Sequence, residues 1–568
     1  MCGIYAHFEY GLLQSKKNKC EQRAMKCAHR GPDNTTKYEI NNAMFVFHRL
    51  SINDLSNAGN QPFIIPTQNH KNSEIICLCN GEIYNSKSLI EKYSLPVKSN
   101  SDCEVIPLLY VHFKGDIESV VKSLDGYFAC VLVDTSTENI FVFRDYFGIR
   151  SLYIQERLSN SGNVDNESYL TIASELKCMD ENDLINAKQF QPRTIRQYSY
   201  SSKKLELIKE YTYYDLQEIS KTIKLQYTEG EKQEKEGKGK EKEILINIRR
   251  LFKNAVKKRL QSDRKVGTFL SGGFDSSVVA NDLSELLPKG TPLYTFSIGM
   301  KDSPDLLAAR IVATAIKSVH TEYIVTPEEM LEELENTIYD VETYDITTIR
   351  ASTMMRMLSK FIARDTDIVV VFSGEGSDEA SGSYIYFHNA PSSSEFHNET
   401  VRLLEDLHYY DVKRGDKCTA CAGLEIRVPF LDRDFIEYYM SIDPKLKQPR
   451  NGVEKYLLRK AFATDSTCKL PTEIIWRTKE AFSDGVSTQT DSWYQIITKH
   501  VNTLEIDSLV YNTEHCRPQT REAAYYRSVF NKFYPHAEHV IPYMWLPKWS
   551  GNVTDPSARV LEIYNKLI

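Results

Sequence analysis

The chain has no uninterrupted apolar stretch approaching the ~20 residues that a membrane helix needs. Its first residues also lack the basic start and apolar run of a secretory signal peptide. Positive charge is not in excess, because the formal net charge of the 568 residues is -7. A protein-wide electrostatic footprint for nucleic acid is therefore missing. We expect a cytoplasmic protein with no membrane and no nucleic acid as partner.

The twelve cysteines do not form the pattern of a disulfide-rich or zinc-binding chain. Cys77 with Cys79, and Cys418 with Cys421, are the pairs that suggest a metal site. A structural zinc site of cysteines needs two pairs at knuckle spacing, and the first pair has the wrong spacing. In a reducing compartment we expect free thiols, packed in the core or at the surface.

Composition is that of a globular protein of two to four domains, with 41% hydrophobic and 26% charged residues. One segment departs from it, residues 229–243, which read EGEKQEKEGKGKEKE and contain no apolar side chain. Such a run buries too little surface to offset its ordering entropy, so we expect a flexible insert, with a charged docking tail as the alternative. The expected units are a first domain over 1–210, a linker with the insert over 211–243, and a second domain over 244–568.

The hydrophobic pattern changes across this insert. Before it, short alternating runs such as AMFVFHRLSI, EIICLCNGEIY and GYFACVLVD predict stacked sheets. After it, helical patterns alternate with the apolar runs VGTFL, LYTFSIG and DIVVVFSG, which predict buried parallel strands in a doubly wound sheet.

Polar loops follow two of these expected strands. VGTFL runs into SGGFDSS at 271–277, where bare backbone before a helix start favours an anion. DIVVVFSG runs into a turn with Glu375, Asp378 and Glu379, and carboxylates near a nucleotide phosphate normally require Mg2+ between them. Ligands bind beyond the carboxyl ends of parallel strands, so both loops are candidate site elements. The alternatives are a glycine-rich turn with a capping aspartate and a solvated acidic loop.

The chain begins Met-Cys-Gly-Ile-Tyr, with a cysteine directly behind the start methionine. If Met1 is removed, the thiol of Cys2 becomes a nucleophile and its freed α-amino group becomes a base beside it. A free α-amino group has a pKa of about 8, so it can accept the thiol proton. The start of the chain is therefore a candidate nucleophilic site.

Ordered motifs along most of the chain resemble those of the glutamine-hydrolysing asparagine synthetase family. The first half contains MCGI, HRGPD, HRLSI, NGEIYN, SDCEVI and RDYFGIRSLY. The second half contains LSGGFDSS, GMKDSPDL, ETYDITTIRAST, SGEGSDEASGSYIYFH, LEIRVPFLD and KEAFSDG. The resemblance implies an α+β N-terminal-nucleophile sandwich with α-β-β-α layers, a class II glutaminase, followed by an α/β doubly wound parallel-sheet ATP-pyrophosphatase domain.

The implied reaction is ATP-dependent synthesis of L-asparagine from L-aspartate with ammonia from L-glutamine. It passes through β-aspartyl-AMP and releases AMP, pyrophosphate and L-glutamate. The implied cofactors are ATP and Mg2+, the partners are small-molecule substrates, and a homodimer is left open. Ammonia would travel internally, since a dry passage between the domains keeps it neutral and nucleophilic.

For the glutaminase half, the resemblance implies removal of the start methionine and attack of Cys2 on the glutamine side-chain amide. It assigns Asn80 and Gly81 as oxyanion donors. Arg49 is implied to clamp the glutamine α-carboxylate with its planar guanidinium, and Asp102 to hold the α-ammonium. For these two charged residues the alternative is an ordinary surface ion pair. The implied glutamine-binding residues are Arg49, Asn80, Gly81, Glu82 and Asp102.

For the synthetase half, the resemblance implies catalytic roles for Glu375, Arg350 and Lys479. Glu375 would accept a proton from attacking ammonia, and Lys479 would neutralise charge on the departing pyrophosphate. Asp275 and Asp378 are implied to hold Mg2+. The implied ATP-binding residues are Leu270, Ser271, Gly272, Gly273, Asp275, Ser276, Ile298, Ser373 and Gly374, with Leu270 and Ile298 at the adenine. Asp378, Asp411 and Arg414 are implied to lie near the intermediate and pyrophosphate.

Two alternatives from other classes stay open at this point. A β-lactam-forming synthetase shares the two-domain plan, but usually loses the nucleophile that Cys2 supplies here. A tRNA-modifying adenylase, or a regulatory glutamine-binding protein, shares only part of the pattern. One departure from the family pattern is Ser383, which stands where glycine is usual and matters only if that backbone needs a positive φ.

Overall fold

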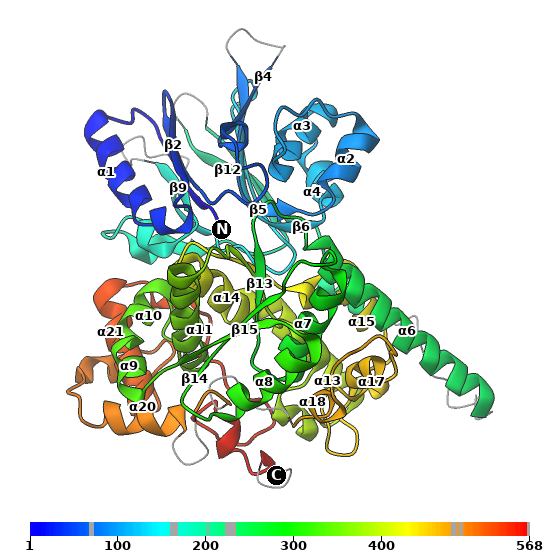
Figure 1. The fold of residues 1–568 in the computed structure, drawn as a ribbon. Helices are drawn as coiled ribbons and strands as arrows, with labels where there is room; N and C mark the ends of the chain where they lie inside the picture. Colours follow the sequence, from blue (N-terminus) through cyan, green and yellow to red (C-terminus); the bar gives the residue numbers. More distant parts are fainter. Residues whose placement is uncertain are drawn as a thin grey trace.

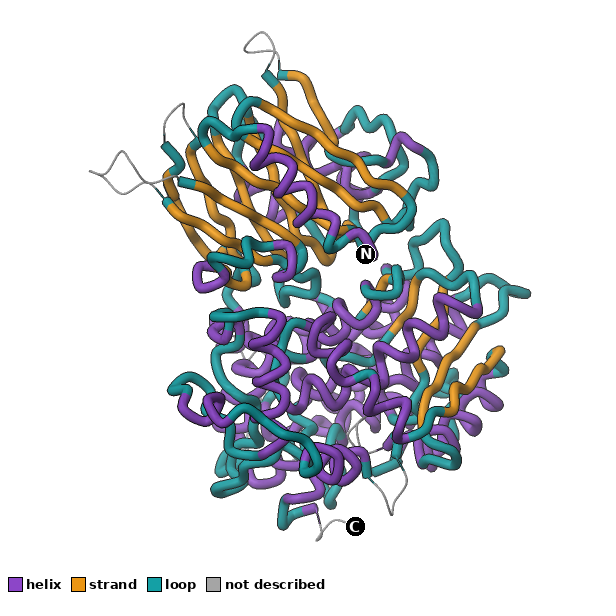
Figure 2. The backbone as a smooth tube through the Cα atoms, turned by 90° about the vertical axis from the view of Figure 1, so that its left-hand side faces the viewer, coloured by secondary structure: helices purple, strands orange, loops and turns teal. Residues whose placement is uncertain are grey.

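The computed structural model describes residues 1–67, 73–158, 168–200, 204–221, 234–478, 485–487 and 492–564. The chain folds into two bodies that lie against each other, one rich in strands and one rich in helices (Figures 1 and 2). The N-terminus lies at the boundary between them. In the described part of the chain, no helix combines the length and apolar character of a membrane span.

The first body is built on two antiparallel sheets, each six-stranded within the described residues. One sheet has the order β10 (Ala187–Gln189), β8 (Tyr153–Arg157), β9 (Tyr169–Ala173), β1 (Gly3–Glu9), β3 (Ala43–Arg49) and β2 (Asn34–Ile40). The other has the order β12 (Glu206–Thr212), β11 (Thr194–Ser199), β7 (Asn139–Arg144), β6 (Gly126–Asp134), β5 (Glu74–Ile83) and β4 (Phe63–Pro66). The helices of this body are α1 (Gln14–Met25), α2 (Ser86–Tyr93), α3 (Val105–His112) and α4 (Ile117–Ser123).

The two sheets enclose an apolar core. Side chains alternate along a strand, so Ile4, Ala6 and Phe8 of β1 enter the same core as Ile76 and Leu78 of β5. α1 packs on β1 and β3, and α3 packs on β4 and β5 of the other sheet. The layers therefore run α-β-β-α, as expected for an N-terminal-nucleophile sandwich.

The second body is built on a parallel sheet with the order β15 (Val319–Ile324), β14 (Tyr294–Gly299), β13 (Val266–Phe269), β16 (Val370–Phe372) and β17 (Glu425–Arg427). The three apolar runs expected to be parallel strands form β13, β14 and β16. After β13 the chain forms β14 and β15 on one side, then returns to form β16 and β17 on the other. Strand order reverses between β13 and β16, which is where parallel sheets open a ligand crevice at their carboxyl ends.

Helices surround this sheet, and α7, α8, α11 and α14 pack directly on its strands. The helices of the second body and its connection are α5 (Leu216–Lys221), α6 (Glu234–Lys258), α7 (Phe274–Leu286), α8 (Pro304–Ile316), α9 (Pro327–Glu332), α10 (Leu334–Val341), α11 (Ile346–Asp365), α12 (Ser377–Ser381), α13 (Ser393–Asp406), α14 (Asp411–Ala420), α15 (Arg433–Met440), α16 (Pro444–Lys447), α17 (Tyr456–Ala463), α18 (Thr472–Ile475), α20 (Trp493–Val501) and α21 (Arg521–Phe533).

α6 begins inside the charged segment, and it reaches away from the body (Figure 1). Residues 234–243 are helical, while 229–233 lie outside the described residues. That the segment is a flexible insert stays a prediction. Glu and Lys are good helix formers, and the buried Ile244, Leu245 and Ile248 anchor the next turns of the same helix. The expected domain boundaries stay predictions; the last strand of the first body ends at Thr212.

Candidate active site

A pocket surrounds Cys2 at the end of the first body, and we call it the Cys2 pocket. Cys2 directly precedes β1, Arg49 ends β3, and Asn80 lies on β5. The lining residues are Cys2, Arg49, Leu50, Ile52, Asn53, Gly59, Gln61, Cys79, Asn80, Gly81, Glu82, Ser101, Asp102, Cys103 and Glu425. The nucleophile and glutamine-binding residues implied by the sequence therefore lie together.

Asn80 holds the backbone at Cys2 and keeps a donor unpaired. The N–H of Cys2 donates to Asn80 Oδ1 at 3.0 Å, and the N–H of Leu50 lies 3.4 Å from Cys2 Sγ. Asn80 Nδ2 is buried, and the described residues offer it no acceptor. A buried, unpaired donor is costly in an ordinary core. Because Asn80 Nδ2 shares this pocket with the Cys2 thiol, it is suited to donate a hydrogen bond to a substrate oxygen.

Arg49 is held by neutral oxygens. Its Nη1 donates to Ser56 O at 2.6 Å and to Asn60 Oδ1 at 2.8 Å, and its Nη2 donates to the carbonyl of Asp54. Because these partners carry no charge, the guanidinium keeps its positive charge for a carboxylate. The loop over 54–60 thus fixes the orientation of the group expected to clamp the substrate.

Asp102 and Glu82 bring two buried carboxyl groups into the Cys2 pocket. Asp102 accepts the N–H of Ile83 at 2.5 Å and the Asn53 amide at 3.2 Å. Asn53 also donates to Glu82 at 2.6 Å. Burial raises the pKa of Asp102 to about 6, and burial with nearby Glu425 raises the pKa of Glu82 well above its usual range.

The second body completes the Cys2 pocket. Glu425 of β17 is in the lining, and its carboxylate lies 3.2 Å from Arg150 and 2.9 Å from Arg427. Arg427 also reaches Glu82, with 3.1 Å between Nη2 and Oε2. The sequence motif LEIRVPFLD contained both residues but gave no reason to place them beside Cys2, because that contact depends on the packing of the two bodies.

Met1 is buried at the boundary of the two bodies, with 1% of its surface exposed. Burial lowers the pKa of its amino group to about 6 and raises the pKa of the Cys2 thiol. While Met1 is attached, the nitrogen of Cys2 is an amide and cannot act as a base. The chemistry expected at Cys2 therefore requires that Met1 be absent.

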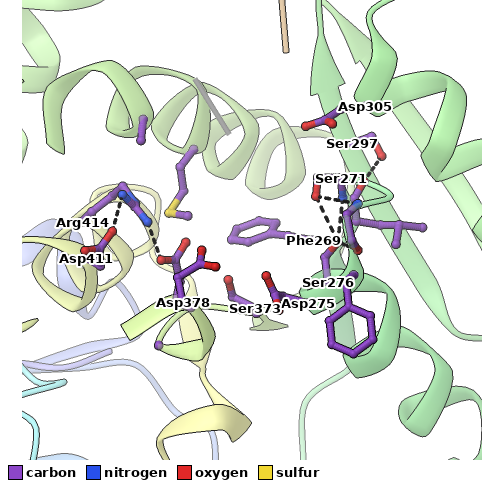
Figure 3. A pocket seen from close by; sticks show the side chains of 18 of the residues that line it. Phe269, Ser271, Asp275, Ser276, Ser297, Asp305, Ser373, Asp378, Asp411 and Arg414 are labelled. Carbon is purple, nitrogen blue, oxygen red and sulfur yellow. Dashed lines mark hydrogen bonds and ion pairs between the residues drawn. The ribbon is translucent and has the colours of Figure 1, made fainter. Parts of the chain in front are cut away.

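The second pocket lies at the carboxyl ends of β13, β14 and β16, and we call it the Asp275 pocket (Figure 3). Its cavity volume is about 210 Å³. The expected residues in its lining are Leu270, Ser271, Gly273, Asp275, Ser276, Ile298, Ser373, Gly374, Glu375, Asp378, Asp411 and Arg414. The other lining residues are Phe269, Phe274, Phe296, Ser297, Asp305, Thr347, Ala351, Met355, Leu358, Gly376, Glu379, Tyr384, Lys455, Arg459, Arg477 and Thr478.

Two glycines let the polar loops pack closely. Gly272 has φ +72°, and a Cβ there would lie 2.4 Å from Ala309 N of α8. A Cβ on Gly374 would lie 2.8 Å from the Cβ of Asp275, in the first turn of α7. Gly272 therefore lets the loop over 271–277 pack closely on α8, although Gly272 does not line the pocket. Gly374 lets the loop after β16 pack closely on the start of α7.

Lys455 joins the two aspartates expected to hold a metal. Its Nζ lies 2.6 Å from Asp275 Oδ1 and 2.6 Å from Asp378 Oδ1. The hydroxyl of Ser377 also donates to Asp275 at 2.6 Å. Sequence reasoning missed Lys455, which directly precedes α17 far along the chain. The available signal was a lysine directly before the apolar run YLL rather than in a charged run.

Glu375 and Arg414 form an ion pair in the same pocket, and Arg414 Nη1 lies 2.7 Å from Asp411 (Figure 3). Burial raises the pKa of Glu375. Arg414 opposes this shift, because its positive charge favours the ionised carboxylate. Glu375 therefore combines a buried position with a pKa above that of an exposed glutamate, as suits a proton acceptor.

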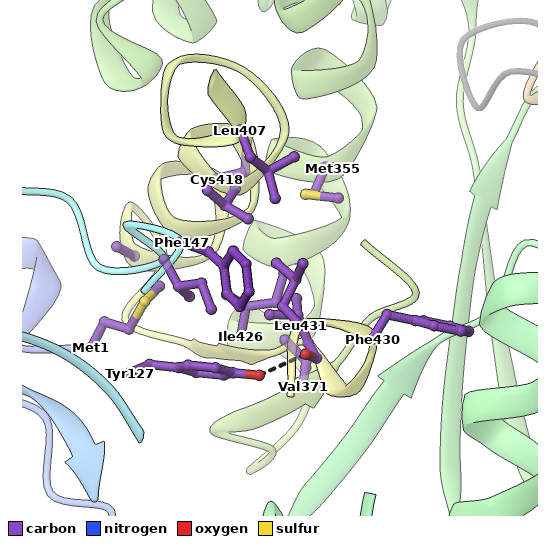
Figure 4. Close-up of a cluster of buried hydrophobic side chains, with 14 of the residues drawn as sticks. Met1, Tyr127, Phe147, Met355, Val371, Leu407, Cys418, Ile426, Phe430 and Leu431 are labelled. Carbon is purple, nitrogen blue, oxygen red and sulfur yellow. Dashed lines mark hydrogen bonds between the residues drawn. The ribbon is translucent and has the colours of Figure 1, made fainter. Parts of the chain in front are cut away.

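Apolar side chains from both bodies pack together in a buried cluster (Figure 4). It runs from Met1 and Tyr127 on the Cys2 side to Ile426 and then to Met355, which lines the Asp275 pocket. The Tyr127 hydroxyl donates to Val428 O at 2.6 Å, which ties the first body to the second at this cluster. This cluster is apolar, while buried ion pairs such as those of Glu425 with Arg150 and Arg427 lie in the same boundary region.

Comparison with known proteins covers both bodies. The family model "Glutamine amidotransferase domain" matches residues 1–236, and "Asparagine synthase" matches 247–396 and 390–556. Proteins named "Asparagine synthetase [glutamine-hydrolyzing]" are 40% identical in Homo sapiens, over 586 residues, and 41% identical in Gallus gallus, over 593 residues. In both cases 100% of each chain is covered.

The chain belongs to the glutamine-hydrolysing asparagine synthetase family.

A solved glutamine phosphoribosylpyrophosphate amidotransferase from B. subtilis is 12% identical, with a TM-score of 0.30, and the alignment covers 84% of this chain and 98% of that one. Because this TM-score is low, the solved structure carries no argument about the fold. The fold assignment of this asparagine synthetase family member is based on its own sheets and on the two family models.

Two residues with expected catalytic roles are not in the Asp275 pocket as described. Arg350 of this synthetase family member is buried and ion-paired, at 2.6 Å from Glu522 and 2.7 Å from Asp555. This arrangement ties α11 to α21 and to the C-terminal segment, and it does not bring Arg350 into the lining. Lys479 lies outside the described residues. Catalytic roles for both stay predictions.

The cysteines of this synthetase family member are all free, and Cys77, Cys79 and Cys418 are buried, as expected. Across the described ranges, no group of three or more His, Cys, Asp or Glu side chains is arranged to hold a metal by itself. A metal at Asp275 and Asp378 would therefore need ligands from a substrate.

Proposed function

We propose that this chain makes L-asparagine from L-aspartate and ATP with ammonia that it releases from L-glutamine. The single observation that carries the proposal is that one chain holds both a thiol pocket, completed by Glu425 of the second body, and a strand-end carboxylate pocket. A glutaminase alone has no use for the second pocket, and an adenylating enzyme alone has no use for the first.

In the glutaminase step, Met1 is removed and the α-amine of Cys2 takes the thiol proton. The thiolate attacks the amide carbon of glutamine, the protonated α-amine of Cys2 passes its proton to the amide nitrogen, and ammonia leaves as the thioester forms. The unpaired Asn80 amide and the backbone N–H of Gly81 stabilise the oxyanion. Arg49 pairs with the α-carboxylate, and Asp102 pairs with the α-ammonium. Water then hydrolyses the thioester and releases glutamate.

In the synthetase step, a β-carboxylate oxygen of aspartate attacks the α-phosphorus of ATP, and pyrophosphate leaves. The resulting bond is that of β-aspartyl-AMP. Leu270 and Ile298 supply apolar contacts for the adenine, and the loop from Ser271 to Ser276 supplies donors for the phosphates. Lys455 is our addition to the expected residues. Its ammonium is placed to neutralise charge on the departing pyrophosphate.

The Asp275 pocket fits Mg2+. Both carboxylates already face one cationic group, Lys455 Nζ, so the pair is arranged for positive charge. Mg2+ is usually held by one or two carboxylates with substrate phosphates and water, and a pair of aspartates meets that need. When bound, Mg2+ would screen the phosphate charges that otherwise repel Asp275 and Asp378.

Ammonia then attacks the activated carbonyl, and AMP leaves. Glu375 accepts the proton that the attacking nitrogen releases, while Arg414 holds its carboxylate in place. We propose the apolar cluster from Tyr127 through Ile426 to Met355 as the route of ammonia, since an apolar environment favours the uncharged, nucleophilic form. We further propose a cytoplasmic enzyme that acts on small molecules; a homodimer stays a prediction.

The test is product stoichiometry with purified chain, glutamine, aspartate, ATP and Mg2+. We expect asparagine, AMP, pyrophosphate and glutamate in equal amounts. ATP consumption without asparagine, or AMP formation that does not depend on aspartate, would contradict the proposal and favour a different adenylating enzyme.

A further inference from the structure

Ser383 fixes Asp378 from two directions. It follows α12 after Gly382, which turns the chain with φ +62°. Ser383 itself does not have a positive φ, so serine at this position carries no backbone strain. Its hydroxyl donates to Asp378 Oδ1, and its backbone N–H donates to Asp378 O at 3.1 Å. The residue is fully buried.

The oxygen that Ser383 contacts is the one that Lys455 contacts. Asp378 Oδ1 lies 2.6 Å from Lys455 Nζ. Asp275 has the same arrangement, because its Oδ1 accepts from Ser377 and faces Lys455. Each aspartate of the pair therefore has one serine hydroxyl and shares one lysine. Two donors on a single carboxylate oxygen fix the plane of the group as well as its position.

We propose that Ser383 is a positioning residue, which orients the Asp378 carboxylate for magnesium pyrophosphate. The inference rests on the proposed role of Asp378 at the phosphates. A hydrogen-bond partner of a metal-ligating carboxylate sets the direction of the carboxylate lone pairs. Loss of such a partner typically weakens metal binding by about 10–100-fold. The hydroxyl of Ser383 is such a partner, and no atom of Ser383 needs to touch the ligand.

The chain offers a matched control in the same short segment. Ser381 is also buried, but its hydroxyl donates to the backbone carbonyl of Ser377 at 2.5 Å. Ser381→Ala removes a buried hydroxyl of equal size without removing a partner of a carboxylate. Ser383→Ala and Ser383→Gly both remove the carboxylate partner and create no steric clash, so one can replace the other if a variant does not fold.

The experiment is isothermal titration calorimetry of the full chain with magnesium pyrophosphate, and separately with AMP. We expect Ser383→Ala to weaken magnesium pyrophosphate binding by about tenfold and to leave AMP binding unchanged. Ser381→Ala should match the parent chain for both ligands. A merely structural role would weaken both ligands in parallel.

Two outcomes contradict the inference in different ways. If the parent chain binds magnesium pyrophosphate and Ser383→Ala binds it equally well, the positioning role is wrong while the proposed function stands. If the parent chain binds no magnesium pyrophosphate, the proposed role of the Asp275 pocket fails, and the inference fails with it.

Discussion

Arg427 of the second body contacts Glu82 of the first, with Nη2 at 3.1 Å from Oε2. The carbonyl of the same Arg427 accepts the N–H of Ser373 at 2.9 Å. Ser373 begins the loop that lines the Asp275 pocket, and Glu82 lines the Cys2 pocket. One buried residue therefore contacts elements of both pockets.

We predict that Glu82→Gln impairs the use of glutamine and spares the use of ammonia. The variant keeps the shape of the side chain but replaces the carboxyl group that faces Arg427 by an amide, which weakens the tie between the Cys2 pocket and β17. Glutamine-dependent asparagine formation should fall about tenfold, as for the loss of one buried hydrogen-bond partner of a charged group, while the ammonia-dependent rate stays nearly unchanged. Both rates are measured by amino-acid analysis.

The matched control is Glu118→Gln. Glu118 pairs with Lys122 at 2.7 Å on the exposed face of α4 in the same body. It should leave both rates unchanged, because exposed pairs contribute little. Equal loss of both rates in Glu82→Gln would show that the residue supports the fold rather than the glutamine pocket.

Asn80→Ala should lower the glutaminase kcat by about 100-fold, the usual cost of one oxyanion donor. The change removes the buried Nδ2 that is unpaired among the described residues. Asn139→Ala, at the start of β7 and outside the Cys2 pocket, serves as the control. A kcat within a few fold of the parent enzyme would exclude Asn80 from oxyanion stabilisation.

Lys455→Met should reduce AMP formation by about 100-fold or more with either nitrogen source, because both need the same activated aspartate. The Lys455 ammonium also holds the carboxylates of Asp275 and Asp378 together. Lys455→Arg is therefore a second variant, which keeps the positive charge between them. Lys460→Met is the control on the same helix, since Lys460 pairs with Glu241 outside the pocket. Loss of glutamine-dependent activity alone would contradict the assignment.

Glutamine affinity should depend on pH through Asp102. Burial raises the pKa of its carboxyl to about 6. Above that pH the charged carboxylate attracts the α-ammonium of glutamine; below it the protonated group does not. KM for glutamine should therefore rise about tenfold per pH unit below pH ~6, as measured in steady-state glutaminase assays. Asp102→Asn should bind glutamine weakly at every pH and lose this dependence; an unchanged pH profile would disprove the assignment.

The sequence predicted most elements that follow local patterns. The alternation in GYFACVLVD gave β6 with its bounds, and the apolar runs before 271–277 and before Ser373 gave β13 and β16. The polar loops after them lie in one pocket because parallel strands end at the same edge of a sheet. The residues Cys2, Asn80 and Asp102 were found by resemblance, and the structure places them together.

Contacts that depend on the packing of distant segments were not predictable. Lys455 reaches the aspartates because α17 packs on α6 and its Phe462 contacts Phe274 of α7. Glu425 enters the Cys2 pocket because the two bodies meet. For Arg350 the sequence motif suggested a catalytic role, but it did not indicate the ion-pair partners. These are Glu522 and Asp555, both distant in sequence, which neutralise its charge. The helix over 234–243 was not predicted, because composition alone does not include the buried turns that follow in α6.

The most direct test of the account follows nitrogen between the two pockets. The parent chain and Cys2→Ala are each supplied with aspartate, MgATP, glutamine labelled with ¹⁵N in its amide, and excess unlabelled ammonium. Mass spectrometry of asparagine should show the label with the parent chain. With Cys2→Ala it should show only unlabelled asparagine, formed at an appreciable rate. Labelled asparagine from Cys2→Ala, or no asparagine from a folded Cys2→Ala chain, would contradict the account.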